Sequence, residues 1–271
     1  MLASGGLEAP KTQMRDCMAA FGIAFAEEEL RVTRADYAID LLAPWFEPDR
    51  EALVVPPGTR IAEHTGVAET ETNATGARVT GLRAGAIANR QLAIYDKRAE
   101  VIAKGKKGWL AIWNATRAAR GEPPLDLTDR DASQVWRFEL RLGAKQLRNK
   151  FEMKGWDDLH DLIGDAYADF CTRMRYCIPS GDRNRARWPA HELWHAVTAR
   201  IDADLAQHRS GVLPQDIKTA NHAEHIRMLD RMLLGLFISR AAASGGTEVE
   251  FPDFMEAHIG ALERSLGEHP L

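Results

Sequence analysis

Three segments of the chain alternate between apolar and ionisable residues, and this alternation constrains the fold more than any other feature. The segments are RVTRADYAIDL (31–41), the start of NRQLAIYDKRAE (89–100) and SQVWRFELRLG (133–143). Because successive side chains of a strand point to opposite faces, each segment has one apolar and one polar face. The pattern predicts an antiparallel sheet with one face packed on helices and the other in contact with water.

Carboxylates and arginines crowd the polar face of two of these strands. Asp36 and Asp40 project from the same side of the first strand, and Glu139 lies between Arg137 and Arg141 on the third. If the two strands are neighbours, the carboxylates converge on a site whose hard oxygen ligands suit Mg²⁺ or Mn²⁺. Cross-strand ion pairing, which stabilises a sheet modestly, is the alternative interpretation.

The order of the elements indicates the fold class. Helices are expected at 10–30 and 97–120, a loop or hairpin at 64–81, and mostly helices from residue 144 onward. Strands followed by helices are typical of an α+β fold rather than a doubly wound sheet. We therefore expect an antiparallel sheet with helices packed on one face in residues 1–150, followed by a mainly helical C-terminal region in residues 151–271.

The composition is that of a globular protein. Of the 271 residues, 45% are hydrophobic and 27% are charged. The sequence contains no apolar run of about 18 residues that would span a membrane, and its N-terminus lacks the pattern of a secretory signal. The cysteines (Cys17, Cys171, Cys177) fit no disulfide framework and indicate a reducing compartment, so we expect a cytoplasmic protein without a membrane partner.

The charge is unevenly distributed along the chain. A net charge of −4 argues against a generic nucleic-acid binder. However, acidic residues outnumber basic ones in 1–77 and 201–271, whereas basic residues predominate in 78–120. Such a basic middle predicts a positive surface that the overall figure hides, and a solvated lysine-rich helix face is the alternative.

The segment AHELWHAV (190–197) contains the His-Glu-x-x-His pattern of zinc peptidases. His191 and His195 would share one helix face with Glu192 beside them, as a zinc site needs. Trp194 stands where those peptidases carry a small residue, and the preceding RNRARWP (183–189) is more typical of a basic turn that faces DNA. These two observations disfavour a zinc metallopeptidase that uses His191, Glu192 and His195, and we keep it as the alternative interpretation.

The three strand segments, in this order, resemble successive signatures of the replication initiation factor family. These proteins are the rolling-circle initiators of plasmids and filamentous phages, also called Rep trans proteins. The resemblance is carried by RVTRADYAIDL, NRQLAIYDKRAE and WRFELRL (136–142), and RNRARWPAHELWHAV (183–197) resembles a further stretch that members carry. It covers residues 30–200.

The resemblance implies a concrete activity. Members nick one strand of an origin duplex with a tyrosine, leaving a 5′-phosphotyrosine and a free 3′-hydroxyl, while a carboxylate-bound metal ion polarises the phosphate. Carried over by position, Asp36 and Glu139 are expected to bind Mg²⁺ or Mn²⁺, with Asp40 as a third ligand. Lys97 is expected to stabilise charge on the phosphate. The side chains expected to contact DNA are Arg34, Arg90, Arg137, Arg141, Arg185 and Arg187.

One departure from the family concerns the nucleophile. Members carry it in a glycine-bearing strand before the YDK strand, but here that strand, RVTGLRAG (78–85), has no tyrosine. Tyr95, on the polar face, is the best candidate among the four tyrosines of the chain. The chain also starts shortly before its first expected strand, as though a family strand were missing. A relative that binds DNA without cutting it is therefore the alternative, and the expected partners are origin duplex or single-stranded DNA, with a helicase and a second copy of the chain as candidates.

Overall fold

The computed structural model describes residues 6–24, 26, 29–65, 79–212, 214–244 and 251–268. Most of the loop or hairpin expected at 64–81 lies outside these residues. The chain divides into two compact units, residues 1–212 and residues 213–271. The fold class is α+β, as the order of the sequence patterns predicts.

A five-stranded antiparallel sheet forms the centre of the first unit. Its strands lie in the order β1-β6-β5-β4-β3. They are β1 (Arg34–Leu42), β3 (Ile61–Thr65), β4 (Val79–Gly85), β5 (Arg90–Asp96) and β6 (Val135–Gly143). A separate pair is formed by β2 (Leu53–Val54) and β7 (Arg175–Tyr176), two short strands that the alternation did not predict. The three predicted strand segments are thus the three neighbouring strands β1, β6 and β5.

The register of the sheet sorts the side chains into two faces, as the sequence predicts. Ala38 of β1 and Ala93 of β5 both pair with Glu139 of β6, so these three positions share one face. Asp36 lies two residues from Ala38 and projects to that same face. We call this side the polar face; the opposite side carries buried residues such as Phe138 and Leu140.

Helices accompany the sheet in the first unit, and α7 and α8 form the second. They are α1 (Glu8–Ala20), α2 (Lys97–Ala103), α3 (Lys107–Ala118), α4 (Ala144–Leu147), α5 (Trp156–Arg173), α6 (Glu192–Leu205), α7 (Pro214–Ala243) and α8 (Phe251–Glu268). Short 3-10 turns lie at η2 (Arg50–Ala52), η3 (Arg185–Arg187) and η4 (Ala206–His208). Within the described ranges, no helix is long and apolar enough to span a membrane.

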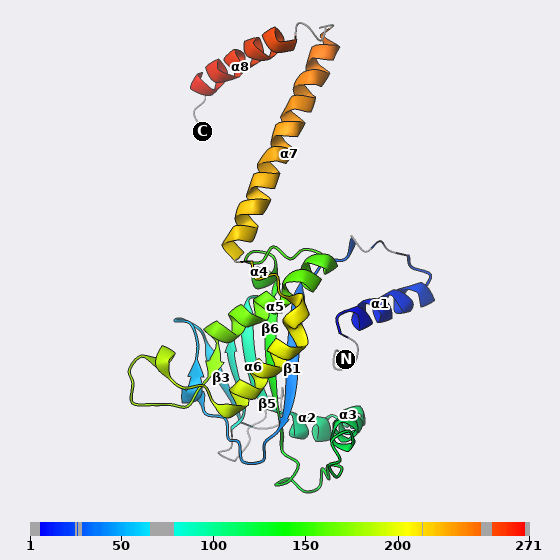
Figure 1. Cartoon of the computed structure of the whole chain (residues 1–271), viewed down its shortest axis with the longest axis vertical. Coiled ribbons are helices and arrows are strands. Elements are labelled where there is room, and N and C mark those ends of the chain that lie inside the picture. The colour runs from blue at the N-terminus through cyan, green and yellow to red at the C-terminus, as the bar shows by residue number, and fades with distance from the viewer. Residues whose placement is uncertain are drawn as a thin grey trace. The chain divides into compact units, whose positions relative to one another are not determined.

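Helices α5 and α6 lie side by side across the apolar face of the sheet (Figure 1). Ile163 and Phe170 of α5 and Trp194 of α6 join one core with the strand residues. The indole of Trp194 is 2% exposed and its ring centre lies 6.5 Å from that of Phe138. This shared core explains why the compact unit extends to residue 212, whereas the sequence pattern placed a division at residue 150.

Helices α2 and α3 form a second, smaller core at one end of the polar face. Trp113 of α3 packs with Val101 of α2 and Val135 of β6. The expected helix at 97–120 is therefore present, as two helices that cover part of the face expected to be open to water. The N-terminal helix, by contrast, ends at Ala20 rather than at residue 30, and Gly22 follows it with a φ of 70°.

Candidate functional site

One row of paired residues crosses all five strands of the polar face. In order across the sheet it contains Asp40, Arg137, Tyr95, Gly81 and His64. Neighbouring strands lie about 4.8 Å apart, so each residue in the row lies beside the next, although Gly81 contributes no side chain. The candidate residues Tyr95, Arg137 and Asp40 are thus brought together, although they come from three distant parts of the sequence.

Tyr95 is held by a carboxylate of the adjacent strand. Its hydroxyl donates a hydrogen bond of 3.1 Å to Oε2 of Glu139. Arg141 donates from Nη2 to the same oxygen at 3.0 Å and from Nη1 to Gln91 at 2.9 Å. This arrangement places a phenol, a carboxylate and a guanidinium in contact on one face.

The surroundings of Tyr95 and Glu139 favour a protonated phenol beside an ionised carboxylate. Burial, followed by the charge of Glu139, raises the pKa of Tyr95. Burial also disfavours the ionised form of Glu139, but the hydrogen bond and charge of Arg141 outweigh it and lower the pKa of Glu139. At neutral pH the phenol is therefore protonated and the carboxylate is ionised, as in a nucleophile paired with a general base.

Asp40 and Arg137 form a buried ion pair under α3. Two guanidinium nitrogens of Arg137 donate to the two oxygens of Asp40 at 2.6 and 2.8 Å, and Trp113 Nε1 donates to Asp40 at 2.8 Å. The guanidinium also lies over the ring of Trp109, 4.1 Å from its centre. Arg137 is only 7% exposed, so its predicted contact with DNA gives way to a contact inside the protein.

The expected metal ligands share a face, but each already has a cationic partner. Arg34 holds both oxygens of Asp36, at 2.7 and 2.5 Å, while Asp40 and Glu139 bind Arg137 and Arg141. In the part of the chain that the structure describes, no group of three or more His, Cys, Asp or Glu side chains can hold a metal ion. Because guanidinium groups occupy the positions where a cation would bind, this donor set does not fit Mg²⁺ or Mn²⁺, and we derive no step through a metal.

Lys97 lies at the start of α2, which Asp96 caps by accepting a hydrogen bond from the Ala99 amide at 2.8 Å. The amine of Lys97 is buried, pairs with Glu100 and lies 4.8 Å from the ring centre of Trp109. Its distance to the ring centre of Tyr95 is 5.8 Å. Lys97 therefore lies near the tyrosine ring, with its amine engaged by Glu100 inside the protein.

Arg90 lies on the apolar face, where α5 covers it. It donates at 2.6 Å to Asp169 of α5 and at 2.8 Å to Gln146, and it is 8% exposed. Its predicted contact with DNA is inconsistent with this position. The strand alternation already places Arg90 on the face of Leu92 and Ile94, and this register was the signal that could have excluded it.

The basic turn at η3 divides into two parts. Arg185 donates to the backbone oxygens of Glu51 and Leu53 and lies over the ring of Trp188, so it ties the turn to β2. Arg187 has a side chain that is 73% exposed and stays a candidate for phosphate contact. Trp188 itself is half-buried, and its Nε1 donates to the Asp182 carbonyl at 2.8 Å.

The His-Glu-x-x-His pattern does not form a zinc site. His191 precedes α6 as its N-cap residue, and its Nδ1 accepts a hydrogen bond of 3.1 Å from the Leu193 amide. The ring is stacked on Trp45, with 6.0 Å between ring centres. Since His191 lies before the helix while His195 is exposed on it, the zinc peptidase alternative is not supported.

No protein-family model and no curated protein matches the sequence. Among solved structures, a rolling circle replication initiator protein from Geobacillus stearothermophilus is similar over 64% of this chain and 57% of its own, with 16% identity and a TM-score of 0.34. The matched part is thus little more than half of that protein, and a similarity this weak establishes neither fold nor function.

Proposed function

We propose that this protein is a replication initiator that binds DNA on the polar face of its sheet and joins one strand covalently to Tyr95. The hydrogen bond from the Tyr95 hydroxyl to Glu139 is the observation that carries the proposal. A phenol in contact with an ionised carboxylate is the arrangement of a nucleophile and its base. This pair lies on the polar face, whereas the similar pair of Tyr37 and Asp204 lies on the helix-covered face.

The reaction uses Tyr95 as the nucleophile and Glu139 as the base, with Arg141 and Lys97 beside them. The phenol oxygen of Tyr95 attacks the phosphorus of a phosphodiester while its proton passes to Oε2 of Glu139. The bond from phosphorus to the 3′-oxygen then breaks, and that oxygen takes a proton from solvent. Arg141 keeps Glu139 ionised before the attack, and Lys97, which also contacts the ring of Trp109, lies over the ring of the phenol.

Binding of a DNA strand is supported by the expected DNA-contacting arginines whose side chains are exposed to solvent. Among the described residues, Arg34 forms its ion pair with Asp36 on its own strand, and its side chain is 40% exposed. Arg187 is more exposed still. Phosphate contacts by such side chains position a strand without reading its sequence.

Covalent trapping tests the proposal without knowledge of an origin sequence. The protein is incubated with single-stranded oligonucleotides of random sequence, with Mn²⁺, with Mg²⁺ and with chelator, and protein-DNA adducts are identified by mass spectrometry. We expect adducts on Tyr95, none with Tyr95→Phe, and a loss of about 10²–10⁴-fold in rate with Glu139→Gln. Tyr37→Phe is the matched control, because Tyr37 lies on the helix-covered face and bonds to Asp204 of α6.

A DNA-binding relative that does not cut is the second candidate. It is favoured by the raised pKa of Tyr95 and by the arginines that occupy the metal positions of the family. Salt-dependent DNA binding without any adduct would select it. The helicase and the homodimer stay predictions. Arginines pair with the expected metal ligands, and the chelator arm of the trapping experiment tests whether a divalent metal is needed all the same.

A further inference from the structure

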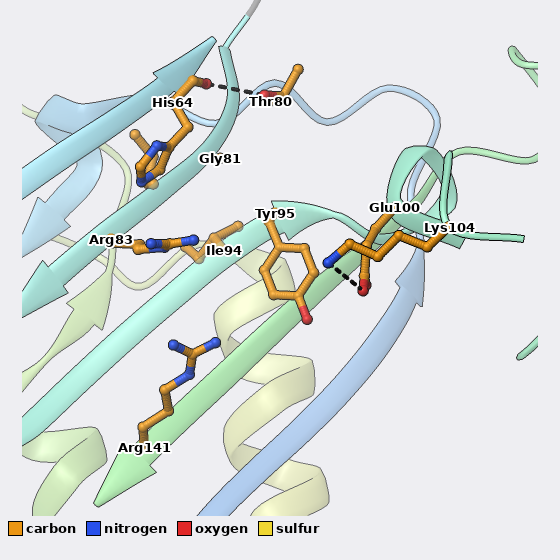
Figure 2. Close-up of a pocket in the computed structure, with 10 residues that line it drawn as sticks. His64, Thr80, Gly81, Arg83, Ile94, Tyr95, Glu100, Lys104 and Arg141 are labelled. Carbon is orange, nitrogen blue, oxygen red and sulfur yellow. Dashed lines mark hydrogen bonds and ion pairs between the residues drawn. The ribbon is translucent and has the colours of Figure 1, made fainter. Parts of the chain in front are cut away.

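A small cavity opens beside Tyr95, over strands β3, β4 and β5. It is lined by His64, Thr80, Gly81, Leu82, Arg83, Ile94, Tyr95, Glu100, Lys104 and Arg141, and its volume is about 50 Å³. A buried water needs about 10–15 Å³ on this measure, so the cavity admits a few waters or a small anion but not a nucleobase. Figure 2 shows Arg83, Tyr95 and Arg141 projecting from three strands into this space.

The backbone is shaped to leave the cavity open. Gly81 lies between His64 and Tyr95 in the row, and a Cβ at this position would lie 3.2 Å from the Tyr95 Cβ. The register of β3 and β4 shifts between His64 and Thr65, and the Thr80 hydroxyl donates to the His64 carbonyl at 3.1 Å. Bulges of this kind often redirect a side chain next to a functional site.

The lining is cationic. Arg83, Lys104 and Arg141 contribute positive charge, and the single carboxylate, Glu100, is already paired with lysines. Its oxygens contact Lys97, Lys106 at 2.6 Å and Lys104 at 3.6 Å. Arg141 also pairs with Glu139, so the lining and its ion-pair partners hold five cations (Arg83, Lys97, Lys104, Lys106, Arg141) against two carboxylates (Glu100, Glu139), an excess of positive charge that favours an anion.

Two nitrogen atoms of the lining lack a hydrogen-bond partner. Among the described residues, none bonds to Nε2 of His64 or to Nε of Arg141, although both atoms are covered from solvent. Burial, and then the charge of Arg83, lower the pKa of His64, so its ring is neutral at pH 7. Nε of Arg141 is a donor, as is Nε2 of His64 in the tautomer that carries its hydrogen there, and the acceptor oxygens of an anion would satisfy both.

We infer that this cavity binds one backbone phosphate of the DNA strand presented to Tyr95, through His64, Arg83 and Arg141. The inference rests on the proposed function for the identity of the strand, but the phosphate site itself is independent of any cutting. It assigns a binding role to His64 and Arg83, which no sequence pattern singled out.

The test uses the full chain and three small probes: the dinucleotide TpT, which has a single phosphodiester, inorganic phosphate, and thymidine. The histidine ring resonances are followed by NMR, with His64 assigned from a His64→Gln variant. We expect TpT to shift the His64 resonance saturably, thymidine to have no effect, and Arg83→Gln to weaken TpT at least tenfold. The exposed Arg50→Gln is the matched control and should bind TpT as the wild type does.

An unmoved His64 resonance, or equal TpT affinity of Arg83→Gln and Arg50→Gln, would overturn the site. Binding of inorganic phosphate without TpT would overturn its assignment to a DNA strand. TpT binding that persists in a protein forming no adduct on Tyr95 would leave the site standing and reject the cutting reaction. The two proposals therefore fail separately.

Discussion

Removing the charge of Asp40 should destabilise the first unit far more than removing that of Asp36, although both aspartates lie on one face of one strand. Asp40 neutralises Arg137, whose side chain is 9% exposed, and accepts from Trp113. Asp36 pairs with Arg34, whose side chain is 40% exposed. The two positions are therefore matched in sequence context and differ in burial.

The expected costs follow from that difference. Asp40→Asn leaves a buried guanidinium without a counter-charge, which costs about 3–5 kcal/mol, and the remaining amide oxygen places the loss at the lower end. Asp36→Asn breaks a solvent-screened pair worth about 0–1 kcal/mol. Replacing both partners of the buried pair, as in Asp40→Leu with Arg137→Met, should recover at least half of the loss, since no unpaired charge remains.

Urea unfolding followed by tryptophan fluorescence measures these costs, because all seven tryptophans lie within residues 1–212. With a slope of about 3 kcal/mol per molar urea, Asp40→Asn should lower the midpoint by about 1 M. Equal midpoints for Asp40→Asn and Asp36→Asn would refute the buried pair. A midpoint for wild type that rises with Mn²⁺, and does so only while Asp40 is present, would restore the metal interpretation.

Further expectations concern pH and charge. Burial lowers the pKa of His191, so the unfolded chain takes up the proton more readily and stability should fall as pH drops below about 6.5. His191→Asn should keep the helix cap and lose this pH dependence of stability. His191→Ala should lower the free energy of unfolding in urea by about 0.5–2 kcal/mol. Despite burial, hydrogen bonds from lysines lower the pKa of Glu100 to about 2. The stability that the ionised Glu100 contributes is therefore present above pH 4.5 and lost toward pH 2. The Glu100→Gln variant should not show this loss of stability in acid unfolding. Arg90→Gln should destabilise the fold and leave the salt dependence of DNA binding unchanged. Arg141→Gln should reduce the slope of log affinity against log salt concentration by about one.

The faces of the sheet were predictable from sequence, and the partners on each face were not. Alternation is a property of one strand, so it assigned Asp36 and Glu139 to a common face without knowledge of the neighbouring strand. Whether a carboxylate meets a metal ion or an arginine depends on register. The register set Asp40 opposite Arg137, whereas Asp36 and Glu139 bind arginines two positions away on their own strands, Arg34 and Arg141.

The cavity beside Tyr95 was beyond prediction for a different reason. It depends on β3, whose five residues show no clear alternation, and on the absence of a side chain at Gly81. A glycine inside a strand signals a bulge or a close approach, but it does not say which side chains border the space. Likewise, His191 matched a zinc pattern by letter, and its role as a helix cap depended on where α6 begins.

Arg141 links the phosphate site to the proposed reaction. In the resting state it lowers the pKa of Glu139 and so weakens the base that must take the proton of Tyr95. A phosphate that engages Arg141 would draw the guanidinium charge away from Glu139 and raise the pKa of that carboxyl when DNA is bound. Because kcat/KM reports the free enzyme and kcat the complex, the acid limb of kcat should lie at higher pH than that of kcat/KM. Coincident acid limbs would mean that Arg141 does not change partners, and would contradict this link.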